Sequence, residues 1–188
     1  LHPRVRRQRQ MCIRDRWYSD RWGEPTHDDR MLFLLLTVGV FQAGLSWQAA
    51  ASKREVFERN FCGMDFRKVA AFFPEDIEQI AKDPEMIQNR RKIKAVVQNA
   101  RAIVLLLNDY DSFADYLWDF VGGVPVLHEY ETAEEVPNTL PEATVIAKDM
   151  KKRGFTFVGP IVTCMFLKAA GIMPVSYTHL RAHETSLH

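Results

Sequence analysis

Apolar residues recur at three- and four-residue steps along much of this chain, which is the spacing of helices that bury one face. The clearest example covers residues 89–107. Its apolar positions are Ile93, Val96, Val97, Ala100, Val104 and Leu107. Residues 161–170 carry Lys168 as their only charge, so we expect a helix there that runs through the core.

Capping residues and prolines predict where the other helices begin and end. Asp28 can cap a helix that runs through Leu36, and Ser112 can cap another over residues 113–121. Further helices are predicted over residues 44–61, 66–72, 75–81 and 141–153. Residues 124–130 are predicted to be extended, as a short strand or an ordered loop. The expected fold class is therefore all-α.

Residues 151–160 predict a helix end, a tight hairpin and a second helix start. Gly154 stands where a helix ending at Arg153 needs a left-handed residue, and Gly159 precedes a proline that can open the next helix. Such a start presents free backbone N–H groups, which suit a phosphate of a nucleic-acid backbone. Three cations lie one hairpin away: Lys151, Lys152 and Arg153. The alternative is an ordinary basic last turn.

Length and composition predict one domain with a substantial core, since the chain has 188 residues and is 47% hydrophobic. We expect this domain to span residues 17–173, either as one body or as two helical lobes with a cleft between them. The three cysteines are widely separated, which argues against a disulfide framework and for a reducing compartment. The longest apolar run, residues 31–38, is too short to cross a bilayer, so we expect no membrane contact.

Charge is distributed unevenly along the chain. The first 16 residues carry +5 and residues 174–188 are neutral, so the net charge of +1 leaves −4 for residues 17–173. An acidic body can bind DNA only through a local basic patch. One candidate combines Lys148 with residues 151–153, and the other comprises Arg90, Arg91, Lys92 and Lys94. Either cluster could instead be a solvated helix face.

Four motifs resemble, in order and spacing, those of the DNA-3-methyladenine glycosylase I family of helix-hairpin-helix glycosylases. The resemblance covers roughly residues 17–172. The motifs lie at residues 41–47, 89–100, 112–121 and 151–160, and Trp22-Gly23 and residues 27–30 fit the family's N-terminal segment. The resemblance implies a helical bundle that binds double-stranded DNA with alkylated bases, flips an alkylated adenine out and hydrolyses its N-glycosidic bond. We expect a monomer in a bacterial cytoplasm.

The same resemblance implies particular site residues. Trp22 and Trp47 correspond to pocket tryptophans that hold the flipped base. Trp17, Tyr18 and Phe41 are expected to complete this pocket. Gln42 and Leu45 correspond to residues that fill the gap left in the duplex. The residues by themselves leave an alternative open, because Trp47 and Leu45 could simply belong to the core.

The chain departs from the family pattern at Gly39, where the family has a glutamate that recognises the methylated adenine. The alternative function is therefore a DNA-binding relative without catalysis or with altered base preference. The motifs assign no catalytic residue. No lysine nucleophile stands next to the hairpin, since Lys168 lies on the predicted core helix, so strand cleavage is not expected.

The family also implies a zinc ion held by an N-terminal Cys and His and a C-terminal His and Cys. Tyr18 occupies the position of the first His, and Cys12 lies in foreign-looking sequence. The four-residue spacing of His179 and His183 is interpreted as coincidence. We therefore expect no metal and no cofactor. Residues 1–16 and 174–188 resemble translated sequencing-adapter read-through and are left out of the predicted fold.

Overall fold

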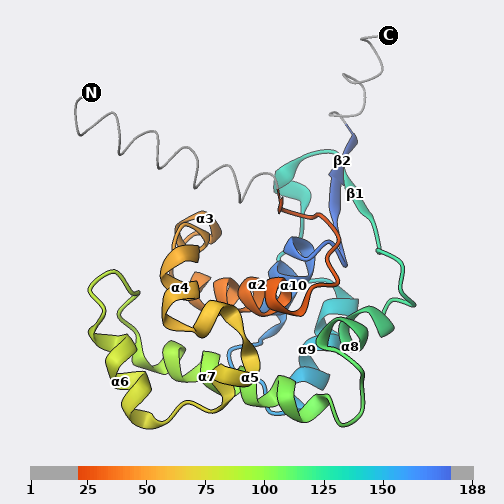
Figure 1. Ribbon diagram of the computed structural model, residues 1–188. Helices are drawn as coiled ribbons and strands as arrows, with labels where there is room; N and C mark the ends of the chain where they lie inside the picture. The colour runs from red at the N-terminus through yellow and green to blue at the C-terminus, as the bar shows by residue number, and fades with distance from the viewer. Residues whose placement is uncertain (1–20, 179–188) are drawn as a thin grey trace, which may run out of the picture.

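Helices form most of the part of the chain that the computed structural model describes, residues 21–178, which confirms the all-α prediction (Figure 1). The helices are α2 (Asp29–Gln42), α3 (Trp47–Ala51), α4 (Arg54–Asn60), α5 (Phe66–Ala70), α6 (Pro74–Lys82), α7 (Arg90–Leu106), α8 (Phe113–Asp119), α9 (Pro141–Lys152) and α10 (Pro160–Ala169). Two 3-10 turns, η1 (Cys62–Met64) and η2 (Ala133–Glu135), lie between them. None of the described helices combines the length and apolar character that a membrane span requires.

Helix α2 forms the centre of the core. Every residue from Met31 to Phe41 is buried, because α3, α7, α8 and α10 pack around this helix. Figure 1 shows α2 beside α10, with α3 and α4 to one side and α8 and α9 to the other. Asp28 caps α2 as predicted, since its carboxylate accepts a hydrogen bond from the Arg30 amide at 3.1 Å. A helix that is apolar on all sides is stable only inside such a bundle.

The sequence predictions were wrong in two details. The helix predicted over residues 44–61 is divided, because a tight turn follows α2 and a second break at Ser52 separates α3 from α4. In α7 the predicted core position Val104 is 37% exposed, whereas Ile103 and Leu106 are buried. Seven residues make about two helical turns, so the buried positions Val96 and Asn99 lead to Ile103 and Leu106, and Val104 falls at the edge of this face.

Two short strands make a parallel pair beside the helices. β1 (His128–Tyr130) lies within the segment predicted to be extended, and β2 (Val175–Tyr177) pairs with it. His128 lies opposite Val175 in this register. β2 thus lies within residues 174–188, which the sequence analysis left out of the predicted fold.

Asp83 connects α4 to the segment between α6 and α7. Its carboxylate accepts hydrogen bonds from Arg59 at 2.7 Å, Asn60 at 2.8 Å and the Glu85 amide at 2.9 Å. The Arg59 guanidinium and these amide donors lower the pKa of Asp83 to about 2. A carboxyl group whose pKa is lower in the folded chain stabilises the fold fully above its unfolded pKa. That stabilisation is lost as the pH falls through the folded value.

We therefore predict that Asp83→Asn lowers the free energy of unfolding near neutral pH but not in strong acid. Denaturant melts of both proteins between about pH 7 and pH 2 measure the difference. The gap between them should begin to close below about pH 4 and be mostly lost by pH 2. A gap that stays constant over this range would contradict the prediction.

Candidate DNA-binding and base-recognition site

The turn after α2 presents the two residues expected to fill the gap in the duplex. Ala43 (φ −57°, ψ 113°) and Gly44 (φ +87°) form a type II turn, closed by a 2.7 Å hydrogen bond from the Leu45 amide to the Gln42 carbonyl. Leu45 is 45% exposed. Leu45 therefore lies at the surface and is not a core residue.

Lys92 of α7 holds this turn from beneath. Its ammonium group donates hydrogen bonds to the carbonyls of Ala43 and Phe41, and Lys92 as a whole is only 7% exposed. Burial lowers the pKa of this lysine, because the charged form loses hydration. In the sequence, Lys92 belongs to a cluster of cations that was a candidate basic patch. Its position four residues before Val96, on the buried face of α7, was the signal that it points inward.

Gln42 and Phe41 lie at the end of α2 with different surroundings. The side-chain oxygen of Gln42 is buried and has no hydrogen-bond partner within residues 21–178. Phe41 is fully buried and stacks on Phe57 with 5.1 Å between ring centroids. We therefore assign Phe41 to the core instead of the expected base pocket, because its ring is already covered on its face.

Trp22 and Trp47 meet edge to face, with 5.1 Å between ring centroids and 78° between ring planes. Trp22 is half-buried and Trp47 is 5% exposed, so Trp47 packs with the core while it contacts Trp22. Gly39 of α2 faces Trp47: a Cβ atom there would lie 3.7 Å from the Trp47 ring and 3.4 Å from a methyl group of Val162. Trp17 and Tyr18 lie outside the described residues.

The position of Trp22 depends on a backbone strap across the end of α10. The amides of Gly23 and Thr26 donate to the carbonyls of Ala169 and Ala170, both at 3.2 Å. Gly171 has φ +70°, and a Cβ atom there would come within 2.4 Å of the Pro25 nitrogen. The close approach of the strap therefore requires glycine at position 171.

The hairpin between α9 and α10 has the predicted geometry. Gly154 has φ +94°, its amide donates to the Lys151 carbonyl, and the Phe155 amide donates to the Met150 carbonyl. These two bonds define a Schellman motif. Gly159 caps α10 and Pro160 is its first residue, as expected from the sequence. The hairpin backbone is thus fixed at both of its glycines.

Two side chains of α7 hold the hairpin in place. The Asn99 side chain donates to the Thr156 carbonyl at 3.2 Å and accepts from the Thr156 amide at 2.7 Å. Gln98 donates to the Gly154 carbonyl at 3.2 Å. Asn99 is buried on the apolar face of α7, where a polar residue at helical spacing could have indicated this role.

The three cations expected to bind phosphate differ in their surroundings. Lys151 and Lys152 are exposed and form no ion pair within the described part of the chain. The Arg153 guanidinium instead contacts Asp149 at 3.0 Å and Asp109 at 3.2 Å, and it lies over the rings of Tyr110 and Tyr116. Because two carboxylates already neutralise Arg153, we leave it out of the proposed phosphate-binding group.

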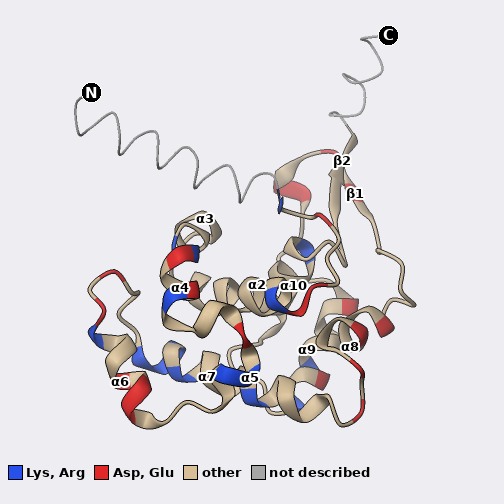
Figure 2. Cartoon of the chain, viewed as in Figure 1, with Lys and Arg blue, Asp and Glu red and all other residues tan. Residues whose placement is uncertain are grey.

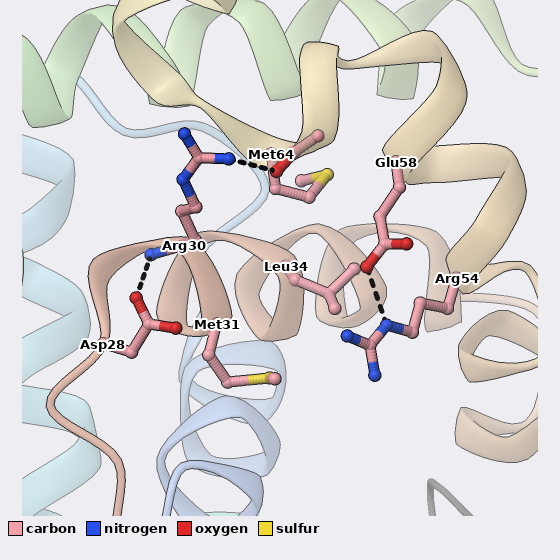
Figure 3. Close-up of a pocket in the computed structure, with 8 residues that line it drawn as sticks. Asp28, Arg30, Met31, Leu34, Arg54, Glu58 and Met64 are labelled. Carbon is pink, nitrogen blue, oxygen red and sulfur yellow. Dashed lines mark hydrogen bonds and ion pairs between the residues drawn. The ribbon is translucent and has the colours of Figure 1, made fainter.

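A separate pocket of about 170 Å³ lies between α2, α4 and η1 (Figure 3). Both of its arginines have partners: Arg54 pairs with Glu58 at 2.7 Å, and Arg30 donates to the Gly63 carbonyl at 3.4 Å. Arg30 lies 12 residues before Gln42, or about 18 Å along the axis of α2. This pocket is therefore not part of the site around the turn after α2.

The type II turn generates a prediction about Gly44. An added Cβ would meet no atom within 4 Å, so the cost of a substitution is backbone strain alone. Gly44→Ala should lower the free energy of unfolding by about 1–2 kcal/mol, the cost of a left-handed conformation for an ordinary residue. Gly44→Asn is the matched control and should cost less, because asparagine tolerates this conformation. Equal losses in denaturant melts would contradict the turn assignment.

Comparison with known proteins identifies the family of this chain. The family model for methyladenine glycosylase matches residues 8–181. The chain is 35% identical to DNA-3-methyladenine glycosylase 1 of Escherichia coli (strain K12) over 157 residues, which is 84% of each chain. It is 30% identical to DNA-3-methyladenine glycosylase of Haemophilus influenzae (strain ATCC 51907 / DSM 11121 / KW20 / Rd), over 84% of this chain and 85% of the relative.

Solved structures with the same fold include 3-methyladenine DNA glycosylase I from Staphylococcus aureus, whose structure addresses 3-methyladenine recognition. That protein superposes with a TM-score of 0.80 and 34% identity over 84% of each chain. A structure of a 3-methyladenine DNA glycosylase I in complex with 3-methyladenine gives the same TM-score, identity and coverage. The family model matches most of this chain, and solved structures share its fold at 34% identity. The chain therefore belongs to the methyladenine glycosylase family.

Proposed function

We propose that this protein removes 3-methyladenine from double-stranded DNA by hydrolysing its N-glycosidic bond, without cutting the strand. The observation that carries the proposal is the tryptophan pair, Trp22 and Trp47, facing Gly39 a short way along α2 from the turn that presents Leu45. Family membership supports the reaction class. An enzyme acting on a base in duplex DNA must take the nucleotide out of the stack and hold it.

The chemistry suits an aromatic pocket. A 3-methylated adenine carries positive charge, so it leaves readily and needs no strong acid to protonate it. Aromatic faces attract a cationic ring, at about 0.5–2 kcal/mol for each favourable contact. Trp22 and Trp47 supply such faces, and extrusion and positioning are then the main contribution of the protein.

The turn and the hairpin supply the other two parts of the function. Leu45 is exposed on a turn that Gly44 makes possible and that Lys92 holds in place. Its side chain can therefore enter the space left by the extruded base. Gln42 adjoins it with a buried amide oxygen that has no partner in the described residues and could accept from a base edge. The hairpin at residues 154–159, with Lys151 and Lys152, binds the backbone phosphates.

The alternative is a relative that binds DNA but has lost catalysis or changed its base preference at Gly39. Base release from alkylated DNA separates the two, when it is compared with binding to a duplex that contains an abasic site. Binding without release of 3-methyladenine would favour the alternative and overturn the proposed reaction.

Substitutions at Trp47 test the pocket directly. Trp47→Leu should lower the rate of 3-methyladenine release by roughly 2- to 30-fold while binding to undamaged duplex changes little, because a stacking surface is removed. Trp47→Phe retains a ring and should keep more of the activity. Circular dichroism melting identifies loss of folding, which is expected in part because Trp47 packs with the core. Normal excision by a folded Trp47→Leu protein would exclude the pocket.

Gly39 provides a gain-of-function test. Gly39→Glu should bind free 3-methyladenine about 10-fold more tightly than the natural chain, because a hydrogen bond to a charged group is worth about 1.5–3 kcal/mol. Gly39→Gln is the matched control, since it has the same shape without the charge. Both variants place a Cβ against Val162, so their common effect measures the steric cost. Titration calorimetry that finds equal affinities would remove the argument for a carboxylate at this position.

The protein is also proposed to work without zinc. The resemblance implies a histidine where Tyr18 stands, and at most one of the family's four ligands has a counterpart in this sequence. The residues present therefore do not fit the family's metal site. We predict well below one zinc ion per chain in metal analysis of purified protein, and unchanged melting after chelator treatment. Stoichiometric zinc would contradict this.

Oligomeric state and location follow from the same function. A monomer is sufficient, because the tryptophan pair, the turn and the hairpin all come from one chain. The curated relatives come from bacteria, where the DNA lies in the cytoplasm, and this protein is proposed to act there.

A further inference from the structure

The cluster of cations at the start of α7 divides into three environments. Arg90 pairs with Glu78 at 2.9 Å, and Lys92 is buried beneath the turn after α2. Arg91 and Lys94 are exposed, and neither forms a salt bridge or a hydrogen bond within the described residues. Figure 2 shows the row of Lys and Arg along α7. Two of these cations thus remain available to a ligand.

Arg91 and Lys94 line a groove that continues into the hairpin. On the α7 side the groove also includes Ala95 and Gln98, and on the other side Thr156 and Phe157, around a volume of about 310 Å³. Residues three apart on a helix are neighbours on its surface, so the two cations lie together. The groove therefore combines a local positive charge with a wall made by the hairpin itself.

Phe157, which lines the hairpin side of this groove, has an unusual backbone conformation. It has φ +56°, and its residue is 38% exposed. A non-glycine residue in this conformation costs of order 1–3 kcal/mol and persists only where its surroundings impose it. Asn99 fixes both backbone groups of the preceding residue, Thr156, and so restricts how the chain enters Phe157. An exposed ring maintained at such a cost suggests a contact with a ligand.

We propose that this groove binds a second segment of the DNA backbone, with Arg91 and Lys94 on phosphates and Phe157 against the sugars. The inference rests on the proposed function, and it extends the DNA-binding surface from the hairpin to α7. Charge complementarity favours DNA, because residues 17–173 carry a net charge of −4 and need a local basic patch to bind it. The groove is also continuous with the hairpin at residues 154–159, since Thr156 and Phe157 belong to it.

The test is the salt dependence of binding to an undamaged duplex. Each phosphate contact contributes about 0.9 to the slope of log K against log salt. The Arg91→Ala/Lys94→Ala double variant should therefore make that negative slope shallower by about 1.8 and weaken binding to any sequence. Arg90→Ala is the matched control on the same turn, and its slope should stay near that of the natural chain because Glu78 already neutralises Arg90.

Further variants separate the groove from the hairpin. The Lys151→Ala/Lys152→Ala variant should lower the slope independently, so that all four substitutions together approach the sum of the two effects. Phe157→Ala should weaken binding with no change of slope, because it removes an apolar contact and no charge. Melting curves confirm that each protein is folded, which is expected for exposed side chains.

The outcomes decide the proposal. An unchanged slope for the Arg91→Ala/Lys94→Ala variant, or an equal loss in Arg90→Ala, would overturn it. Release of 3-methyladenine is measured separately on the natural chain. If that release is absent while the slope falls as expected, the groove stands and the proposed reaction fails. If release occurs while the slope is unchanged, the reaction stands and the groove fails.

Discussion

One helix, α7, holds both of the turns proposed to meet DNA. Lys92 donates to the carbonyls of the turn after α2, and Asn99 and Gln98 bond to the backbone of the hairpin. A buried polar group left without a partner costs about 1–3 kcal/mol, so these contacts strongly restrict where either turn can lie. The distance between the turn that presents Leu45 and the hairpin proposed to bind phosphate is therefore set by the separation of Lys92 and Asn99 along one helix.

This arrangement has a functional consequence. Extrusion of a base requires that the protein push at one point while it holds the strand at another. A site built on regular helices keeps such points in fixed relation better than one built on loops. The same helix exposes Arg91 and Lys94, so α7 combines structural support on its buried face with free charge on its exposed face.

Gly39 limits the chemistry of the proposed pocket. A pocket without a carboxylate beside Trp47 would discriminate bases mainly by stacking, which is weaker and less selective than a hydrogen bond to a charged group. Glycine inside a helix also costs about 1 kcal/mol relative to alanine, although α2 is packed tightly enough to remain helical. The position is close to Val162, so the space there depends on α10 as well as on α2.

The sequence by itself determined the helical class, most helix bounds, the hairpin geometry and the family. These features depend on interactions within about four residues, such as the cap at Asp28 and the left-handed Gly154, or on motifs read directly. It did not predict the break at Ser52, the exposure of Val104 or the core position of Phe41. Only the tertiary structure decided that Lys92 bonds to the turn after α2, that Arg153 is neutralised by Asp109, and that Arg91 faces the hairpin. The physical reason is distance along the chain: Lys92 meets a carbonyl 49 residues away and Arg153 a carboxylate 44 residues away, so the role of each charge depends on how the helices pack.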